Sequence, residues 1–112
     1  MFVLQRDPQW DWPVTVQAPG EGVAVPMRFS ARWRLVPLAE AAALARTEDG
    51  IDTLLRLAIV ELRDIVDEAG QPVPHGPALL EALLAIPWVR AGLVRAYADA
   101  VSGTPSAAAA GN

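Results

Sequence analysis

Apolar and polar residues alternate most clearly in residues 27–35. The apolar residues at every second position are Met27, Phe29, Ala31, Trp33 and Leu35. Because successive side chains of a strand point to opposite faces, this segment is expected to form a strand with one apolar and one cationic face. A shorter alternation at Val14 and Val16 precedes it, and the turn-forming residues 18–22 (Ala-Pro-Gly-Glu-Gly) separate the two. Residues 13–36 are therefore predicted to form a β-hairpin.

The apolar residues after the hairpin have helical spacing. A short helix is predicted over residues 37–46, and a longer one from Asp49, a good N-cap, to about Val66. Pro77 and Pro87 are suited to the first turns of two more helices, the last of which is expected to stop at Gly103. The residues of this last helix that are expected to face inward are Trp88, Val89, Leu93, Tyr97 and Val101.

Length and composition favour one α+β domain, with an N-terminal β-hairpin packed on a cluster of about four α-helices. The chain has 112 residues, of which 53% are hydrophobic, enough to form a core. The domain is expected to span residues 1–103, divided into an arm (1–12), the hairpin (13–36) and a helical part (37–103). Residues 104–112 have no charge and no large apolar side chain, so a flexible tail is predicted there.

The predicted arm contains two candidate partner-binding residues, Trp10 and Trp12. Pro8 and Pro13 interrupt this aromatic stretch, and its apolar residues are not periodic. The favoured interpretation is an arm docked on its own core. The alternative is an arm that binds a partner, since tryptophan is enriched at binding hot spots.

Arg28, Arg32 and Arg34 form a cationic row on the polar face of the second predicted strand. Like charges at this spacing repel one another unless something acidic or polar covers them. Three explanations are open. The row is a solvated face that opposes aggregation, or it pairs with the acidic segment 48–68 of its own domain or of a second copy, or it binds nucleic acid. The net charge of −4 weighs against the last of these. These arginines are a second set of candidate partner-binding residues.

The residue types give no support for an enzyme. The only histidine, His75, lies in a proline-rich loop, and there is no cysteine. Asp64, Asp67 and Glu68 do not follow a calcium-loop pattern and are better explained as a solvated helix end. We therefore expect no catalytic residues, no metal site and no organic cofactor.

The N-terminal sequence lacks a charged segment followed by an apolar run, and the apolar runs are far shorter than the roughly 20 residues of a membrane span. The absence of cysteine fits a reducing compartment. The expectation is a soluble, intracellular protein that binds neither membranes nor nucleic acid.

Several motifs follow one another in a characteristic order. After the arm come PVTVQAPGEG (residues 13–22) and MRFSARWRLVP (residues 27–37). A helix then leads into DEAGQP (residues 67–72), and the last helix ends in AYADAVSG (residues 96–103). In this order, over about residues 1–103, the chain resembles the tail assembly chaperones of long-tailed phages and prophages.

The resemblance implies a protein that acts in the cytoplasm of the host bacterium during phage tail assembly. Such a chaperone binds the tape-measure protein, helps to recruit tail-tube subunits and is not retained in the mature virion. Self-association is a further expectation. The alternative is a structural tail component, such as a tail completion or joining protein, which remains in the particle.

Overall fold

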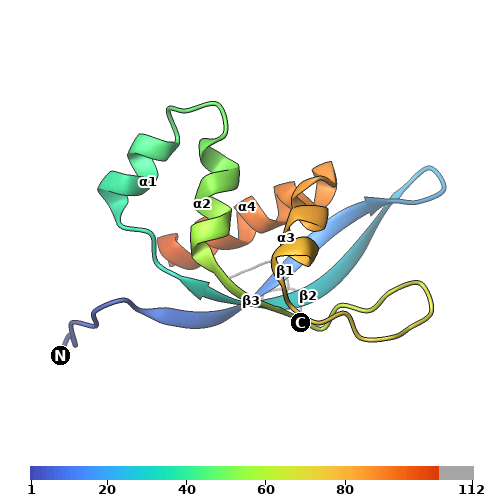
Figure 1. Ribbon diagram of the computed structural model, residues 1–112, viewed down its shortest axis with the longest axis horizontal. Helices are drawn as coiled ribbons and strands as arrows, with labels where there is room; N and C mark the ends of the chain where they lie inside the picture. The colour runs from blue at the N-terminus through green and yellow to red at the C-terminus, as the bar shows by residue number, and fades with distance from the viewer. Residues whose placement is uncertain (104–112) are drawn as a thin grey trace.

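The computed structural model describes residues 1–103, so the tail predicted for residues 104–112 lies outside the described residues. The elements in chain order are β1 (Gln9–Pro19), β2 (Ala24–Arg34), α1 (Leu38–Leu44), α2 (Gly50–Ala58), β3 (Ile59–Arg63), α3 (Pro77–Leu84) and α4 (Pro87–Ser102). The strands form one antiparallel sheet in the order β1-β2-β3, and the helices lie on one side of it (Figure 1). The prediction of an α+β fold with an N-terminal hairpin is confirmed.

The hairpin is longer than predicted and begins at Gln9 instead of residue 13. Its register places Trp10 opposite Trp33 and Val14 opposite Phe29, so the apolar residues of both strands share one face. In the turn, the Gly20 N–H donates to the Val23 carbonyl at 2.8 Å. The next glycine, Gly22, has a φ of 76°, which side chains other than glycine rarely adopt.

The helix predicted to run from Asp49 to Val66 ends at Ala58, and residues 59–63 form β3 instead. Two β-branched residues, Ile59 and Val60, favour the extended conformation at this point. The strand pairs with β2, placing Leu62 opposite Ala31, and the register shifts between Arg32 and Trp33. The prediction of one continuous helix was wrong. The spacing of apolar residues in this segment fits a helix, but it also fits a strand that pairs with β2.

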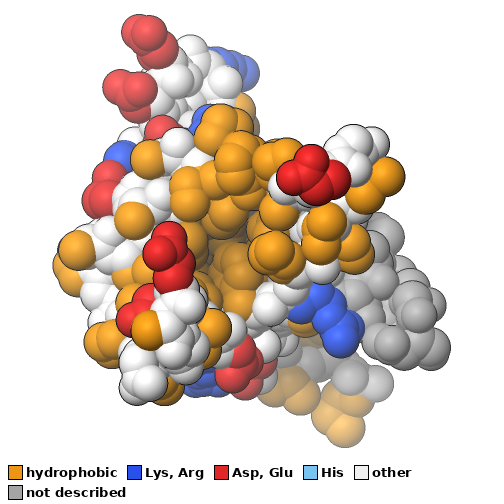
Figure 2. Space-filling view, turned by 90° about the vertical axis from the view of Figure 1, so that its right-hand side faces the viewer, with side chains coloured by type: hydrophobic (Ala, Val, Ile, Leu, Met, Phe, Trp, Pro, Cys, Tyr) orange, Lys and Arg blue, Asp and Glu red, His pale blue; other side chains and the backbone are white. Residues whose placement is uncertain are grey.

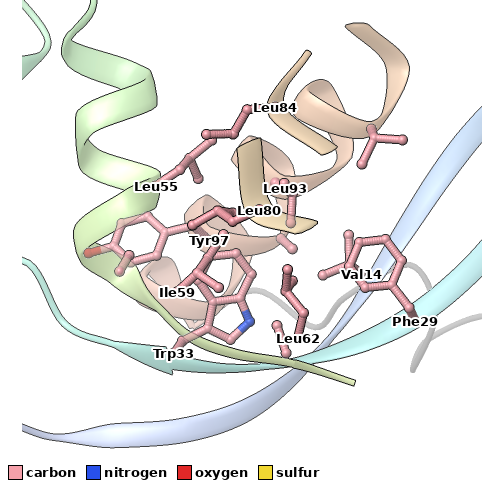
Figure 3. Packing of buried hydrophobic residues seen from close by; sticks show 14 of the residues in the cluster. Val14, Phe29, Trp33, Leu55, Ile59, Leu62, Leu80, Leu84, Leu93 and Tyr97 are labelled. Carbon is pink, nitrogen blue, oxygen red and sulfur yellow. The ribbon is translucent and has the colours of Figure 1, made fainter. Parts of the chain in front are cut away.

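The core lies between the sheet and helices α2, α3 and α4 (Figure 3). Phe29 and Trp33 are both buried, as the sequence predicts. The rings of Trp33 and Tyr97 have centroids 5.8 Å apart, and the Tyr97 hydroxyl accepts a buried hydrogen bond from the Val36 N–H at 3.0 Å. Tyr97 therefore joins α4 to Trp33 at the end of β2 through packing, and to Val36 just after the strand through a hydrogen bond.

Helix α4 packs closely along β1. A Cβ added at Gly92 would lie 2.7 Å from the Thr15 carbonyl oxygen, so only glycine permits this approach. The buried residues of the helix are Val89, Gly92, Leu93, Ala96 and Tyr97. Trp88 and Val101, which were expected to face inward, are 42% and 46% exposed, so that part of the prediction is wrong. Both positions lie to the side of the stripe that meets the strand.

Two ion pairs join the helices to one another. The Arg56 guanidinium contacts both carboxylate oxygens of Glu81 at 2.7 and 2.8 Å, which links α2 to α3. This hydrogen bonding lowers the pKa of the Glu81 carboxyl and raises the pKa of Arg56. Arg90 on α4 donates to Asp52 on α2 at 2.7 Å. The acidic residue Asp52 of segment 48–68 is thus paired with a helix arginine and not with the cationic row on β2.

Candidate protein-binding surfaces

The structure places Trp10 and Trp12 in β1, where both are partly buried against the core. The carbonyl of Trp12 accepts a hydrogen bond from the Trp33 indole at 3.3 Å. Neither the Trp10 nor the Trp12 indole N–H has a hydrogen-bond partner among the described residues. Both tryptophans therefore belong to the sheet of their own domain, and the part of the predicted arm that precedes the strand is residues 1–8.

The cationic row lies on the outer face of the sheet, opposite the helices. Arg32 is 3.4 Å from Asp11, its neighbour across the sheet, and Arg34 is 3.2 Å from Asp7. Arg28 lies further along the same strand, opposite Thr15 in the register. For Arg32 and Arg34 the acidic partners are therefore residues near the start of the hairpin and not the segment 48–68.

Strand β3 adds charges to the same face. Arg63 contacts Asp11 at 3.0 Å and Glu61 at 2.9 Å, so Asp11 lies between two arginines. The hydrogen bond from Arg63 lowers the pKa of Glu61. These exposed pairs each contribute little to stability, and salt screens them. The outer face thus carries acidic and basic groups side by side, and we call these residues the charge ladder: Asp11, Arg28, Arg32, Arg34, Glu61 and Arg63.

An apolar surface that the sequence did not predict lies at the turn end of the hairpin. On β1, Val16 and Ala18 are buried under α4. Their cross-strand partners on the same face of β2, Met27 and Val25, are 54% and 38% exposed because no helix covers this part of the strand. Exposure of Val25 and Met27 on the inner face of a sheet marks the point where the helical layer ends.

The first turn of α4 adds an exposed tryptophan at the same end of the hairpin. Trp88 lines a groove together with Val23 and other residues of the hairpin turn. Figure 2, which views this end of the molecule, shows hydrophobic side chains around a hollow, with acidic groups nearby. We call the four exposed residues Val23, Val25, Met27 and Trp88 the hairpin-end surface. The sequence pattern identified Met27 and Trp88 as apolar but gave no sign of where the helical cover stops.

The first four residues form a second exposed apolar segment. Met1, Phe2, Val3 and Leu4 are 119%, 87%, 70% and 74% exposed, respectively, and extend away from the sheet (Figure 1). At the root of this arm is a pocket of about 480 Å³ between the arm, the end of β2 and helices α1 and α2. Leu35 and Leu57, which line it, are 40% and 42% exposed. The arm and the hairpin-end surface lie at opposite ends of the molecule.

His75 has a structural contact. Its Nδ1 atom accepts a hydrogen bond from the Leu62 N–H at 3.1 Å, so the loop after β3 folds back and occupies the open edge of that strand. The Val73 N–H donates to the Ile65 carbonyl at 2.8 Å and closes the same loop. Within residues 1–103, no three His, Asp or Glu side chains are grouped so that they could hold a metal ion.

No single helix of the described chain is long and apolar enough to cross a membrane. Helices α3 and α4 together have the length and composition, but they are bent by 104° at the break between them. Both contribute buried residues to the core, among them Leu80 and Leu93.

No family model, no curated protein and no solved structure matches this chain.

Proposed function

We propose that this protein is a tail assembly chaperone of a long-tailed phage or prophage, without enzymatic activity, which holds an apolar segment of the tape-measure protein on its hairpin-end surface. The observation that carries the proposal is the exposure of Val25 and Met27 on the inner, apolar face of an otherwise covered sheet. The colinear order of motifs over about residues 1–103 supports the choice of family.

The shape and chemistry of the hairpin-end surface suit an amphipathic helix. A helix that lays its apolar face in a groove uses side chains spaced along one stripe. The groove at this end is lined by Trp88 of α4 and by the hairpin turn with Val23, and Val25 and Met27 add exposed apolar side chains on the inner face of β2. Contiguous exposed apolar surface marks interaction sites in folded proteins. The same end has acidic residues in its two loops, Glu21 and the pair Asp67 and Glu68, all of them exposed. A client segment with basic flanks fits best.

The charge ladder on the outer face is a separate surface for a second partner. In the proposed function it meets tail-tube subunits, with Arg28, Arg32 and Arg34 facing acidic groups of that partner. Since exposed charges are screened over about 8 Å at physiological ionic strength, this second contact weakens as salt rises. The client contact, which is apolar, keeps most of its strength.

Co-expression with the tape-measure protein of the same genome tests the proposal. The wild-type chain is expected to keep the tape-measure protein in solution and to copurify with it. Met27→Asp places a charge on the hairpin-end surface and should abolish copurification. Leu38→Asp is the matched control, because Leu38 is 86% exposed on α1, away from this surface. Equal copurification of both variants, or none with the wild type, contradicts the proposal.

Mass spectrometry of purified particles separates the chaperone from the alternative, a tail completion or joining protein. A chaperone is absent from finished particles. Recovery of this chain in a fixed ratio to the tail-tube protein would assign it to the structural components.

A further inference from the structure

The molecule has an exposed apolar segment at one end and an exposed apolar surface at the other. The segment is Met1–Leu4, whose four side chains are all at least 70% exposed. The hairpin-end surface lies at the far end of β1, a strand of 11 residues that spans about 36 Å. Water contact with this much apolar surface at two places is unfavourable, and association that covers both is correspondingly favoured.

The arm does not reach the hairpin-end surface of its own chain. The chain leaves the arm at Gln9 and runs directly to the hairpin turn, so the two lie at opposite ends of the same strand (Figure 1). Met1–Leu4 lie within eight residues of Gln9, and eight residues extend over at most about 29 Å, less than the length of β1. The direct return path along the inner face is filled by the core residues Val14, Ala31 and Trp33, each 0% exposed. When the arm docks on another copy, neither its short reach nor the filled inner face of its own sheet prevents the contact.

We propose that the arm of one copy docks on the hairpin-end surface of the next copy, head to tail. In an extended segment, residues two apart point to the same side, so Phe2 and Leu4 present their side chains together. Val25 and Met27 have the same spacing on β2, which allows the two pairs to interleave.

Charge favours the same arrangement. Arg6 follows the apolar residues of the arm and is exposed, whereas the hairpin end has Glu21, Asp67 and Glu68 in its loops. An arm laid on the hairpin-end surface brings this arginine to the acidic side of the groove.

A contact between unlike surfaces gives a ring if the rotation between copies closes, the smallest ring being a dimer with both arms exchanged, and an open chain if it does not. The association is independent of any client, but one consequence rests on the proposed function. A client that binds the hairpin-end surface must displace the neighbouring arm, so client binding and self-association exclude each other.

Sedimentation of the full chain over a range of concentrations tests the proposal. The wild-type protein should grow in mass as concentration rises. The arm variant Phe2→Ser with Leu4→Ser and the surface variant Met27→Asp should each associate roughly tenfold or more weakly, since even 1.4 kcal/mol of lost contact gives tenfold. Leu38→Ser removes an equally exposed leucine from α1 and should associate like the wild type. Unchanged circular dichroism and melting temperature show that the variants are folded.

Mixing the two defective variants gives the sharpest result. The surface variant retains an intact arm, and the arm variant retains an intact surface. An equimolar mixture should form one-to-one dimers and no larger species, because only one interface of the chain is complete. A monomeric wild type, an association that needs the arm but not Met27, or a mixture that stays monomeric each overturns the proposal.

Copurification with the tape-measure protein and self-association are separate measurements, so the two proposals can fail separately. If the chain self-associates in this way and neither it nor the arm variant binds the tape-measure protein, the proposed function fails and the head-to-tail interface stands. If the tape-measure protein binds and the wild type is monomeric, the interface is refuted and the proposed function stands.

Discussion

Gly92→Ala tests how closely α4 packs against the sheet. The Cβ of the new alanine would lie 2.7 Å from both the Thr15 carbonyl oxygen and the Val16 Cγ1 atom. Separations below 3.0 Å require something to move. One of these atoms belongs to the backbone of β1, which pairs with β2 along its length, so the strand cannot yield without moving its neighbour. Relief must come from a shift of α4.

Two effects of opposite sign decide the magnitude. Extra methyl groups in well-packed interiors cost about 1–3 kcal/mol. Replacing a glycine in a helix interior by alanine returns about 1 kcal/mol of helix propensity. Because the close contact involves backbone, we take the upper part of the packing range and expect a net loss of about 1–2 kcal/mol in the free energy of unfolding. The melting temperature should fall by roughly 4–8 °C.

Urea denaturation monitored by tryptophan fluorescence measures this loss as a lower midpoint at unchanged slope. Ala91→Gly, at an exposed position of the same helix, calibrates the propensity term in its own context and should cost about 1 kcal/mol. If Gly92→Ala is as stable as the wild type or more stable, the contact between α4 and β1 gives way at no cost and the packing argument is wrong.

Three further changes probe the core and the ion pairs. Trp33→Ala should lose about 3–5 kcal/mol in denaturant titration, because Trp33 is 0% exposed; a loss below about 1 kcal/mol would contradict its place in the core. Tyr97→Phe keeps the ring but leaves the buried Val36 N–H without its acceptor, and should cost about 1–3 kcal/mol; a neutral result would mean that water replaces the hydroxyl. The pKa of Glu81 is lowered by Arg56, so the stability from this pair is present above the ordinary glutamate pKa of about 4.3 and is lost as pH falls through the lowered value. Glu81→Gln should therefore reduce the difference in melting temperature between about pH 6 and pH 3; an unchanged difference would show that the pair is fully screened.

The hairpin could be predicted because alternation over residues 27–35 is a local signal. The sequence pattern does not reveal the start of the hairpin at Gln9, because Pro13 indicates a break between residues 1–12 and the strand. Proline is tolerated there since β1 is an edge strand, where the missing N–H need not weaken the ladder. For the same reason the pairing of Arg32 with Asp11 could not be predicted. That contact requires the first strand to include residue 11.

Strand β3 shows the limit of periodicity as a guide. Leu55, Ala58 and Leu62 satisfy helical spacing, and Leu62 satisfies the strand as well. What decides between them is the open edge of β2, which gains hydrogen bonds from a third strand. That edge is far away in sequence, so no local window contains the information.

The hairpin-end surface escaped prediction for a related reason. The apolar character of Met27 and Trp88 indicated burial, and burial depends on how far the helices extend over the sheet. Helix α4 begins at Pro87 and runs along β1, so it covers Val16 and leaves Met27 on β2 exposed. This path of the helix depends on tertiary packing and not on the local sequence pattern. Sequence pattern alone therefore assigns to the core some apolar residues that lie just beyond the helical cover. In the structure these residues are exposed and become candidate binding residues.

The two edges of the sheet bear on how a partner binds. Along β1, α4 is packed so closely that Gly92 meets the strand backbone. On β3, His75 accepts the hydrogen bond from the Leu62 N–H. Addition of a partner strand is the usual use of an open edge, and both outer edges are occupied at these points. Strand β3 pairs with β2 only over Ser30–Trp33, so among the described residues the edge of β2 before Ser30 has no strand neighbour on that side. This stretch includes Val25 and Met27, whose side chains are exposed on the inner face. We therefore infer that a partner at the hairpin end contacts these side chains, so that changing Met27 alters affinity while the pairing of β1 with β2 stays intact.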